Sequence, residues 1–195
     1  MIEKGGDVKE AGDLTKEDLV AFEVEMAQLF EAAQIHAPVH LSGGNEDDLI
    51  RIFQHVKPTD WVFSTHRSHY HALLKGISKE WLKAEILAGH SITLNNREHK
   101  FFSSAIVGGI LPIAVGVAMT GETTWCFVGD MAGSGGIFFE CYKYAIGHDL
   151  PITFVIEDNG WSVNSPTKEV WGSKLSSYEY LRQYPHVGSG KWVTF

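Results

Sequence analysis

Carboxylate and amide side chains follow two apolar segments of the sequence. Asp130 comes directly after "TWCFVG", and Asn159 comes shortly after "PITFVIE". Both segments are predicted to be buried strands, and the residues at 135–147 between them are predicted to form a helix. A strand, a helix and a second strand at this spacing indicate a parallel pair. Because ligands bind beyond the carboxyl ends of strands in such sheets, Asp130 and Asn159 are expected to face one crevice.

The oxygen atoms at these strand ends suit Mg²⁺. Asp130 offers a carboxylate, Asn159 a carbonyl oxygen, and Gly160 lets the chain turn so that a backbone carbonyl near Trp161 faces inward. Mg²⁺ shares its ligand shell with water and phosphates, and the glycines at 133–136 begin a helix whose free N–H groups favour an anion. The pattern therefore predicts a metal and diphosphate site. The alternative is an ordinary turn and cap at each strand end.

The composition narrows the class of protein. The chain has 195 residues, 44% of them hydrophobic, and a formal net charge of −8, which argues against a nucleic-acid-binding surface. Two cysteines, Cys126 and Cys141, do not make a disulfide framework, so a reducing cytoplasm is expected. No signal peptide is evident, and the apolar stretch at 105–119 is too short and too broken to span a membrane.

The other elements are read from apolar spacing and helix-start signals. Thr15 is a predicted N-cap, with Asp18 three residues on, for an N-terminal helix. Residues 1–12 are expected to be a flexible lead, and 13–195 a single domain of the α/β class with a doubly wound, mostly parallel sheet. Further helices are predicted near 47–53, 67–77, 79–88, 109–119 and 176–185, strands near 61–65, 124–129, 151–157 and 186–195, and a loop at 95–109.

Three separate motifs resemble those of thiamine diphosphate-dependent enzymes, and in particular the α subunits of the decarboxylating component of 2-oxo acid dehydrogenases. "GDMAGSGGIFFE" and "IEDNGW" resemble the family's Gly-Asp-Gly signature and its paired asparagines, about thirty residues later. "HRSH" at 66–69 resembles Tyr-Arg-x-His, and "AIVGGILPIAVGVA" at 105–118 resembles the Gly-Ile-Val-Gly segment. The resemblance implies the diphosphate-binding half of the thiamine diphosphate-binding fold.

The resemblance also assigns residues to Mg²⁺ and thiamine diphosphate. Asp130, Asn159 and the backbone of Trp161 are the expected metal ligands. Arg67 is expected to grip the diphosphate, and backbone atoms of Ala105 and Val107 the aminopyrimidine ring. Cofactor contacts are also expected from the segment after the first strand, namely Gly129, Asp130, Met131 and Ala132.

Two histidines are the best catalytic candidates by motif position. His66 and His69 are expected near the thiazolium ring, where a histidine transfers protons or binds a substrate anion. His71 and His90 are weaker candidates. Three positions depart from the family pattern: Met131 replaces a glycine, Asp158 an asparagine, and His66 a tyrosine.

The implied activity is cleavage of the bond next to a carbonyl, with transfer of the acyl or ketol unit. The first expectation is 2-oxo acid decarboxylation in a dehydrogenase-like α₂β₂ assembly. A separate β-type chain would supply the pyrimidine-binding domain and the glutamate beside the cofactor's ring nitrogen. Few residues follow Asn159, so the long loops of dehydrogenase subunits are expected to be missing. The alternatives are a transketolase-like carboligase acting on a small ketose, or an acyloin-forming carboligase, and a catalytically silent cofactor-binding or scaffolding chain. An unrelated Mg²⁺-phosphate enzyme, such as a phosphatase of open α/β fold, is a further alternative, although the Lys or Thr that it needs at a later strand end has no candidate here.

Overall fold

The computed structural model describes residues 14–172, which form an α/β fold around a five-stranded sheet. The strand order is β2-β3-β1-β4-β5, and every pairing in this sheet is parallel except that of β2 with β3. The predicted α/β class with a mostly parallel sheet is confirmed. The strands are β1 (Trp61–Ser64), β2 (Asn95–Asn96), β3 (Phe101–Ser103), β4 (Thr124–Gly129) and β5 (Ile152–Glu157).

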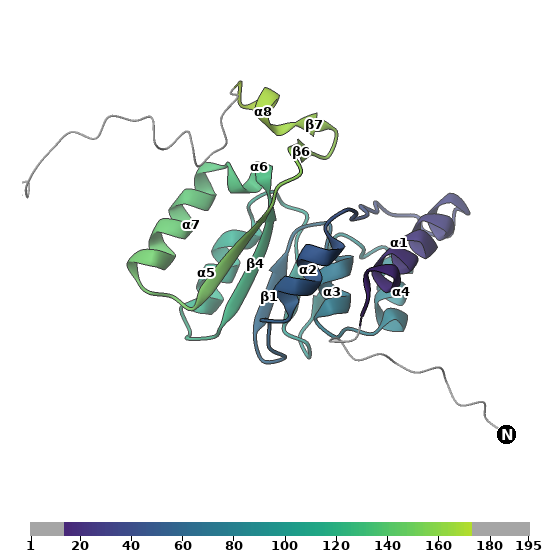
Figure 1. The fold of residues 1–195 in the computed structure, drawn as a ribbon, viewed down its shortest axis with the longest axis horizontal. Helices are drawn as coiled ribbons and strands as arrows, with labels where there is room; N and C mark the ends of the chain where they lie inside the picture. Colours follow the sequence, from purple (N-terminus) through teal and green to yellow (C-terminus); the bar gives the residue numbers. More distant parts are fainter. Residues whose placement is uncertain (1–13, 173–195) are drawn as a thin grey trace, which may run out of the picture.

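Helices precede and connect the strands (Figure 1). The N-terminal helix α1 begins as predicted, because Thr15 and Asp18 form a reciprocal capping box. The predicted tail helix at 176–185 and strand at 186–195 lie outside the described residues. The helices are α1 (Lys16–Glu31), α2 (Glu46–Phe53), α3 (His69–Leu74), α4 (Lys79–Leu87), α5 (Ile110–Ala118), α6 (Asp130–Gly133), α7 (Gly136–Gly147) and α8 (Thr167–Val170).

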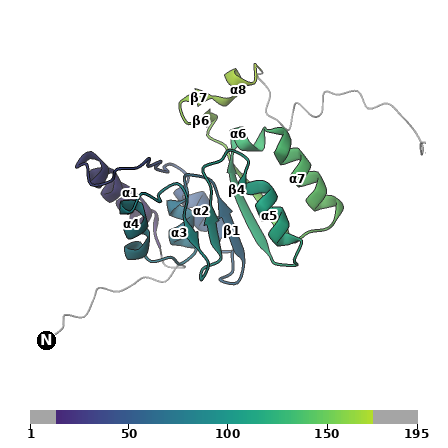
Figure 2. The ribbon, with the colours of Figure 1, turned by 180° about the vertical axis from the view of Figure 1, so that it is seen from behind.

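Two apolar cores lie on the two faces of the sheet. Successive residues of a strand point to opposite faces, and Val62 belongs to one core whereas Phe63 belongs to the other. The first core packs the sheet against α1–α4, and the second packs it against α5 and α7, on the opposite side of the sheet (Figures 1 and 2). The central strands β1 and β4 are thus covered on both sides, as their unbroken apolar sequences predict.

Two expectations about strands are wrong. Phe101–Ser103 and Asn95–Asn96 form strands inside the segment predicted as a loop, since β3 adds to the free edge of β1. The segment at 151–157 is a strand, but its faces are not fully covered, and the Ile156 side chain is 46% exposed. Within the described part of the chain, β5 pairs only with β4 and is therefore an edge strand.

The carboxyl ends of β4 and β5 carry the short elements that shape the site. Helix α6 starts directly after β4, and a hairpin of β6 (Trp161–Ser162) and β7 (Ser165–Pro166) follows β5 at the same end of the sheet (Figure 1). Gly160 has a φ of 72°, which confirms the expected turn. Within residues 14–172, no helix combines the length and apolar character needed to cross a bilayer.

Candidate functional site

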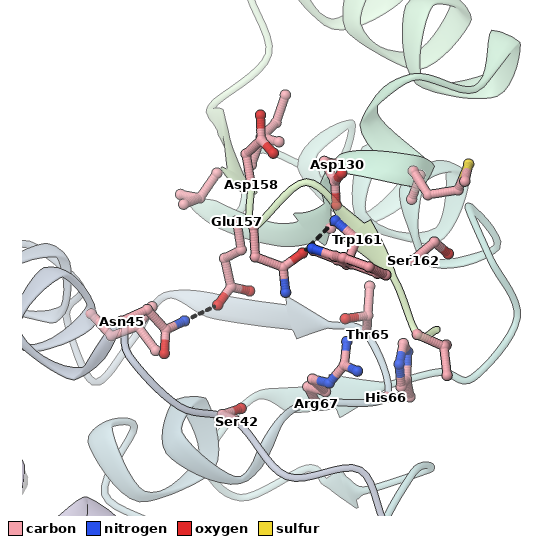
Figure 3. Close-up of a pocket in the computed structure, with 18 of the residues that line it drawn as sticks. Ser42, Asn45, Thr65, His66, Arg67, Asp130, Glu157, Asp158, Trp161 and Ser162 are labelled. Atoms are coloured by element: carbon pink, nitrogen blue, oxygen red, sulfur yellow. Dashed lines mark hydrogen bonds between the residues drawn. The ribbon is translucent and has the colours of Figure 1, made fainter. Parts of the chain in front are cut away.

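A cavity of about 820 Å³ opens at the carboxyl ends of the parallel strands. Its walls come from loops after β1, β3, β4 and β5 and from the start of α2 (Figure 3). Ten of the eleven residues predicted for the site line this cavity, in keeping with the rule for open α/β sheets. They are His66, Arg67, Ala105, Val107, Gly129, Asp130, Met131, Ala132, Asn159 and Trp161.

Asp130 supplies a buried carboxylate with an unused oxygen. It is the first residue of α6 and is only 7% exposed. Its Oδ2 atom is buried and has no hydrogen-bond partner among residues 14–172. Because an unpaired buried carboxylate is costly, a cation at this oxygen would remove an energetic penalty. The environment of Asp130 therefore fits a metal ligand.

Asn159 lies across from Asp130 on the loop after β5. Parallel pairing sets Gly129 opposite Glu157, which brings the ends of the two strands to the same level. The Asn159 side-chain oxygen accepts a hydrogen bond of 2.9 Å from the Trp161 backbone N–H. A carbonyl oxygen has a second lone pair, so this bond leaves one acceptor position for a cation.

The donor set is too sparse to enclose an ion by itself. No group of three His, Cys, Asp or Glu side chains is arranged around a potential metal position in the described residues. The Asp130 carboxylate and the Asn159 amide oxygen, with the Trp161 backbone carbonyl expected from the sequence, would match the partial ligand set that Mg²⁺ takes when water and phosphate complete its shell. The residues present thus fit Mg²⁺ together with a phosphate-bearing group.

Arg67 and His66 lie on the opposite side of the cavity, between β1 and α3 (Figure 3). The pKa of His66 is lowered to about 4 by burial, by His40 and by the Arg67 guanidinium, in that order. His66 Nε2 is buried and has no hydrogen-bond partner among residues 14–172. His66 is therefore a neutral ring with a free nitrogen, close to a permanent cation.

His40 is a neighbour of the site that sequence reasoning missed. Its ring packs edge-on against His66, with centroids 4.6 Å apart and an interplanar angle of 85°. The pKa of His40 is lowered, mainly by burial and then by Arg67. His40 comes from the loop after α1, far from His66 in the sequence, and no motif marked it.

The structure does not bring His69 to the cavity. His69 is fully buried at the start of α3, and its ring is turned toward α1 and the loop after α4. Its Nδ1 lies 3.2 Å from Glu23 Oε1, and its Nε2 lies 2.9 Å from Ser91 Oγ. Both ring nitrogens are engaged in the interior, so this position does not support the expected catalytic role.

The weaker histidine candidates also lie elsewhere. His71 is fully buried between β1 and α2, and His90 lies on the surface with its Nδ1 2.8 Å from Glu85 Oε2. Neither lines the cavity.

The segment at 105–107 forms an exposed wall of the cavity. Gly108 follows it with a φ of 75°, and a Cβ atom there would lie 2.8 Å from Ile137 Cγ2. This glycine lets the segment pass close to α7. In this position Ile106 and Val107 point outward, at 72% and 68% exposure. Met131, at the position of the family's glycine, is partly buried and lines the same cavity.

Several polar lining residues were not predicted. Thr65, Ser42, Asn45 and Glu157 all border the cavity (Figure 3). Asn45 Nδ2, at the start of α2, donates a 2.7 Å hydrogen bond to Glu157 Oε1, at the end of β5. No local pattern announces this contact, because its partners are 112 residues apart.

Comparison with known proteins agrees with this geometry. The family model described as "Dehydrogenase E1 component" matches residues 16–179. The chain belongs to the dehydrogenase E1 component family.

Named relatives in this E1 family fall into two groups. The pyruvate dehydrogenase E1 component subunit alpha-3 of Arabidopsis thaliana chloroplasts is 31% identical, covering 80% of this chain and 42% of the relative. The pyruvate dehydrogenase E1 α subunit of Porphyra purpurea is 32% identical, covering 73% and 48%. The α subunit of the acetoin:2,6-dichlorophenolindophenol oxidoreductase of Bacillus subtilis is 30% identical, covering 76% and 50%. The chain thus spans about half the length of the curated relatives it matches.

Proposed function

We propose that this E1-family chain is an α-type subunit that binds Mg²⁺ and thiamine diphosphate and acts in cleavage of the bond next to a substrate carbonyl. The buried, unpaired oxygen of Asp130 carries this proposal. It faces a cavity that also holds Asn159 and Arg67, the two other residues that the family motifs assign to metal and diphosphate. A buried anion without a partner is expected where a cation binds.

The chain's own residues divide the work of binding. Asp130, Asn159 and the backbone carbonyl of Trp161 would hold Mg²⁺, and Arg67 would bind the diphosphate, since a guanidinium pairs well with phosphate oxygens. Backbone atoms of Ala105 and Val107 would border the aminopyrimidine. The remaining cofactor contacts would come from Gly129, Met131 and Ala132, which line the same cavity.

His66 is suited to a hydrogen-bonding role. Thiamine diphosphate supplies, when bound, a nucleophilic carbon that protein side chains cannot provide. With a pKa of about 4, His66 is neutral at physiological pH. Its free Nε2 can therefore form a hydrogen bond with a bound molecule without adding a charge to the site. Arg67 beside it supplies the positive charge of this wall.

A β-type partner chain completes the proposed enzyme. It would contribute the pyrimidine-binding domain and the catalytic glutamate in an α₂β₂ assembly, which we place in the cytoplasm. The exposure of Ile106 and Val107 supports a partner at this edge of the cavity, because large apolar side chains at such a rim favour an interface. We also propose that residues 13–195 form a single domain; the lead expected at 1–12 lies outside the described residues.

The first proposed reaction is decarboxylation of a 2-oxo acid, in line with the relatives named as pyruvate dehydrogenase subunits. The second candidate is cleavage or formation of an uncharged acyloin, in line with the relative named for acetoin. The charges in the cavity favour both over a ketose phosphate. Of the lining arginines, Arg51 is paired with Asp48, and Arg67 alone remains for the cofactor's own phosphates.

Substrate trials of the assembled enzyme would decide between these reactions. The full-length chain and its β-type partner, with Mg²⁺ and thiamine diphosphate, should release CO₂ from a 2-oxo acid. Turnover of acetoin without CO₂ release would favour the acyloin candidate, and turnover of a ketose phosphate would contradict the charge argument. Cofactor binding without any turnover would favour a scaffolding chain. Robust turnover without a partner would overturn the partner requirement.

Replacement of Asp130 gives a test that does not need turnover. Asp130→Asn should weaken Mg²⁺-dependent cofactor binding by roughly 100-fold or more, measured by titration calorimetry, because ligand-sphere changes cost at least 10–100-fold. The same variant should raise the stability of the cofactor-free chain by about 1 kcal/mol, since a buried unpaired charge is removed. Asp47→Asn, on the exposed start of α2, is the control. Unchanged binding in Asp130→Asn would refute the metal assignment.

A further inference from the structure

Glu157 is a carboxylate at the edge of the cavity to which the family motifs give no role. It is the last residue of β5 and directly precedes Asp158 and Asn159. Its side chain is 22% exposed and borders the cavity. Any contact that fixes Glu157 therefore also fixes the start of the loop that carries Asn159.

The first contact of Glu157 joins β5 to α2. Asn45 is the N-cap residue of α2, a position where asparagine ordinarily caps the helix with its side chain. No such cap bond forms, and Asn45 Nδ2 instead donates to Glu157 Oε1 at 2.7 Å (Figure 3). The usual capping bond is absent, and the same side chain forms a bridge across the cavity edge.

The second contact joins β5 to α3. His71 Nε2 lies 3.3 Å from Glu157 Oε2, a close contact whose geometry is not that of a hydrogen bond. The His71 ring is fully buried and packs in a cluster with the rings of Phe53 and Phe127, whose centroids lie 6.0 Å and 4.5 Å from it and 5.3 Å from each other. This ring has little freedom to move, so it offers Glu157 a rigid partner.

The other ring nitrogen of His71 contacts Ser64 on β1. His71 Nδ1 lies 2.8 Å from Ser64 Oγ on β1. This bond ties the ring to β1 and holds its Nε2 edge toward Glu157. Ser64, His71 and Glu157 thus connect the central strand β1 to the edge strand β5 through the interior.

These contacts reinforce the end of a strand that has one neighbour. In the described part of the chain β5 pairs only with β4, so its tip depends on side chains for further support. The preceding residue, Ile156, packs on the opposite face, where its side chain lies against Gly133 of α6. Glu157 holds the tip from one face and Ile156 holds it from the other.

We propose that Glu157 is a positioning residue that fixes the tip of β5 against α2 and α3 and thereby sets where Asn159 presents its oxygen. The link to metal binding rests on the proposed function, whereas the fixing of the loop does not. The effect is one of geometry. Glutamine at this position keeps the size of the side chain and can still accept from Asn45.

Hydrogen exchange in the full-length, cofactor-free chain tests the positioning step directly. The Gly160 and Trp161 amides donate to the side chains of Asp158 and Asn159, both at 2.9 Å. In Glu157→Ala these amides should exchange about tenfold faster or more, the change expected when a hydrogen bond to a charged group is lost. Glu157→Gln should stay within about twofold of the wild type, and amides of the β4 core should not change.

Two further variants serve as controls for the exchange experiment. Asn45→Ala removes one of the two contacts and should give an intermediate increase in exchange at the same amides. Glu80→Ala, on the exposed surface of α4, removes a carboxylate far from the cavity and should have no effect there. Unchanged exchange in Glu157→Ala, or equal acceleration in Glu157→Gln, would overturn the positioning role.

Cofactor affinity tests the second step. In the full chain with its β-type partner, Glu157→Ala should weaken Mg²⁺-dependent thiamine diphosphate binding by about 10-fold, the scale of residues that orient metal ligands, and Glu157→Gln should restore it. Accelerated exchange with wild-type affinity would overturn the link to Asn159. If the wild-type assembly does not bind the cofactor, the proposed function fails, and the exchange experiment still decides the positioning role.

Discussion

At the scale of single residues, the family motifs predicted the place of some side chains in the cavity correctly and of one, His69, incorrectly. Asp130 and Asn159 were predicted from strand ends, which converge at one edge of a parallel sheet, and Arg67 was predicted from its motif; all three line one cavity. His69 belongs to the same motif as Arg67 but points into the interior toward Glu23. Sequence spacing places a residue on an element, and only packing decides which way its ring turns.

The neutral state of His66 leads to a prediction about pH. The folded chain protonates His66 near pH 4, whereas the unfolded chain protonates it near 6.5, the ordinary value. The unfolded state therefore binds more protons between these values, and the stability due to neutral His66 is complete above pH 6.5 and declines as the pH falls toward 4. His66→Asn should flatten this decline in urea denaturation curves, whereas His55→Asn, at an exposed position, should not.

An unchanged pH profile in His66→Asn would mean that His66 has the same pKa in the folded and unfolded chain. In that case burial does not favour the neutral ring, and the support that the lowered pKa gives to the hydrogen-bonding role of His66 is lost.

At the scale of elements, continuous apolar segments were predicted correctly as strands, whereas very short strands and contacts between distant residues were not predicted. The segments that became β1, β4 and β5 were predictable because each is a continuous apolar run between turn signals. Strands β2 and β3 were missed because they are two and three residues long. β3 forms by pairing with the distant β1, and β2 then pairs with β3. The Asn45–Glu157 bond was out of reach for the same reason, since nothing local distinguishes its partners.

The turn before α5 is expected to be intolerant of a side chain. Gly108→Ala would place a Cβ atom 2.8 Å from Ile137 Cγ2 at a φ of 75°, so it should destabilise the chain by about 1–3 kcal/mol in urea denaturation. Gly116→Ala, inside α5 with open space around it, should instead stabilise by about 0.5–1 kcal/mol. Equal effects of the two substitutions would show that the turn carries no strain.

At the scale of the whole molecule, the exposed wall beside the cavity predicts dependence on a partner. Burying an isoleucine side chain is worth about 1.5–3 kcal/mol. Ile106→Ser should therefore weaken association with the β-type chain by roughly 10-fold or more in sedimentation experiments, with little change in the stability of the isolated chain. Phe30→Ser, on the exposed surface of α1, is the matched control.

Full association of Ile106→Ser with the partner would place the interface elsewhere on the chain. Loss of stability in the isolated variant would instead assign Ile106 to the fold.

The hairpin after β5 carries a tryptophan, Trp161, whose fluorescence can report on the cavity. The Trp161 indole is 51% exposed, lines the cavity and follows Asn159 by two residues. An indole that exchanges water for a bound ring or phosphate changes its emission, and comparison with Trp161→Phe would isolate that signal from the other tryptophans. Occupancy of the cavity can thus be followed by fluorescence in real time, without a label and before any substrate is known.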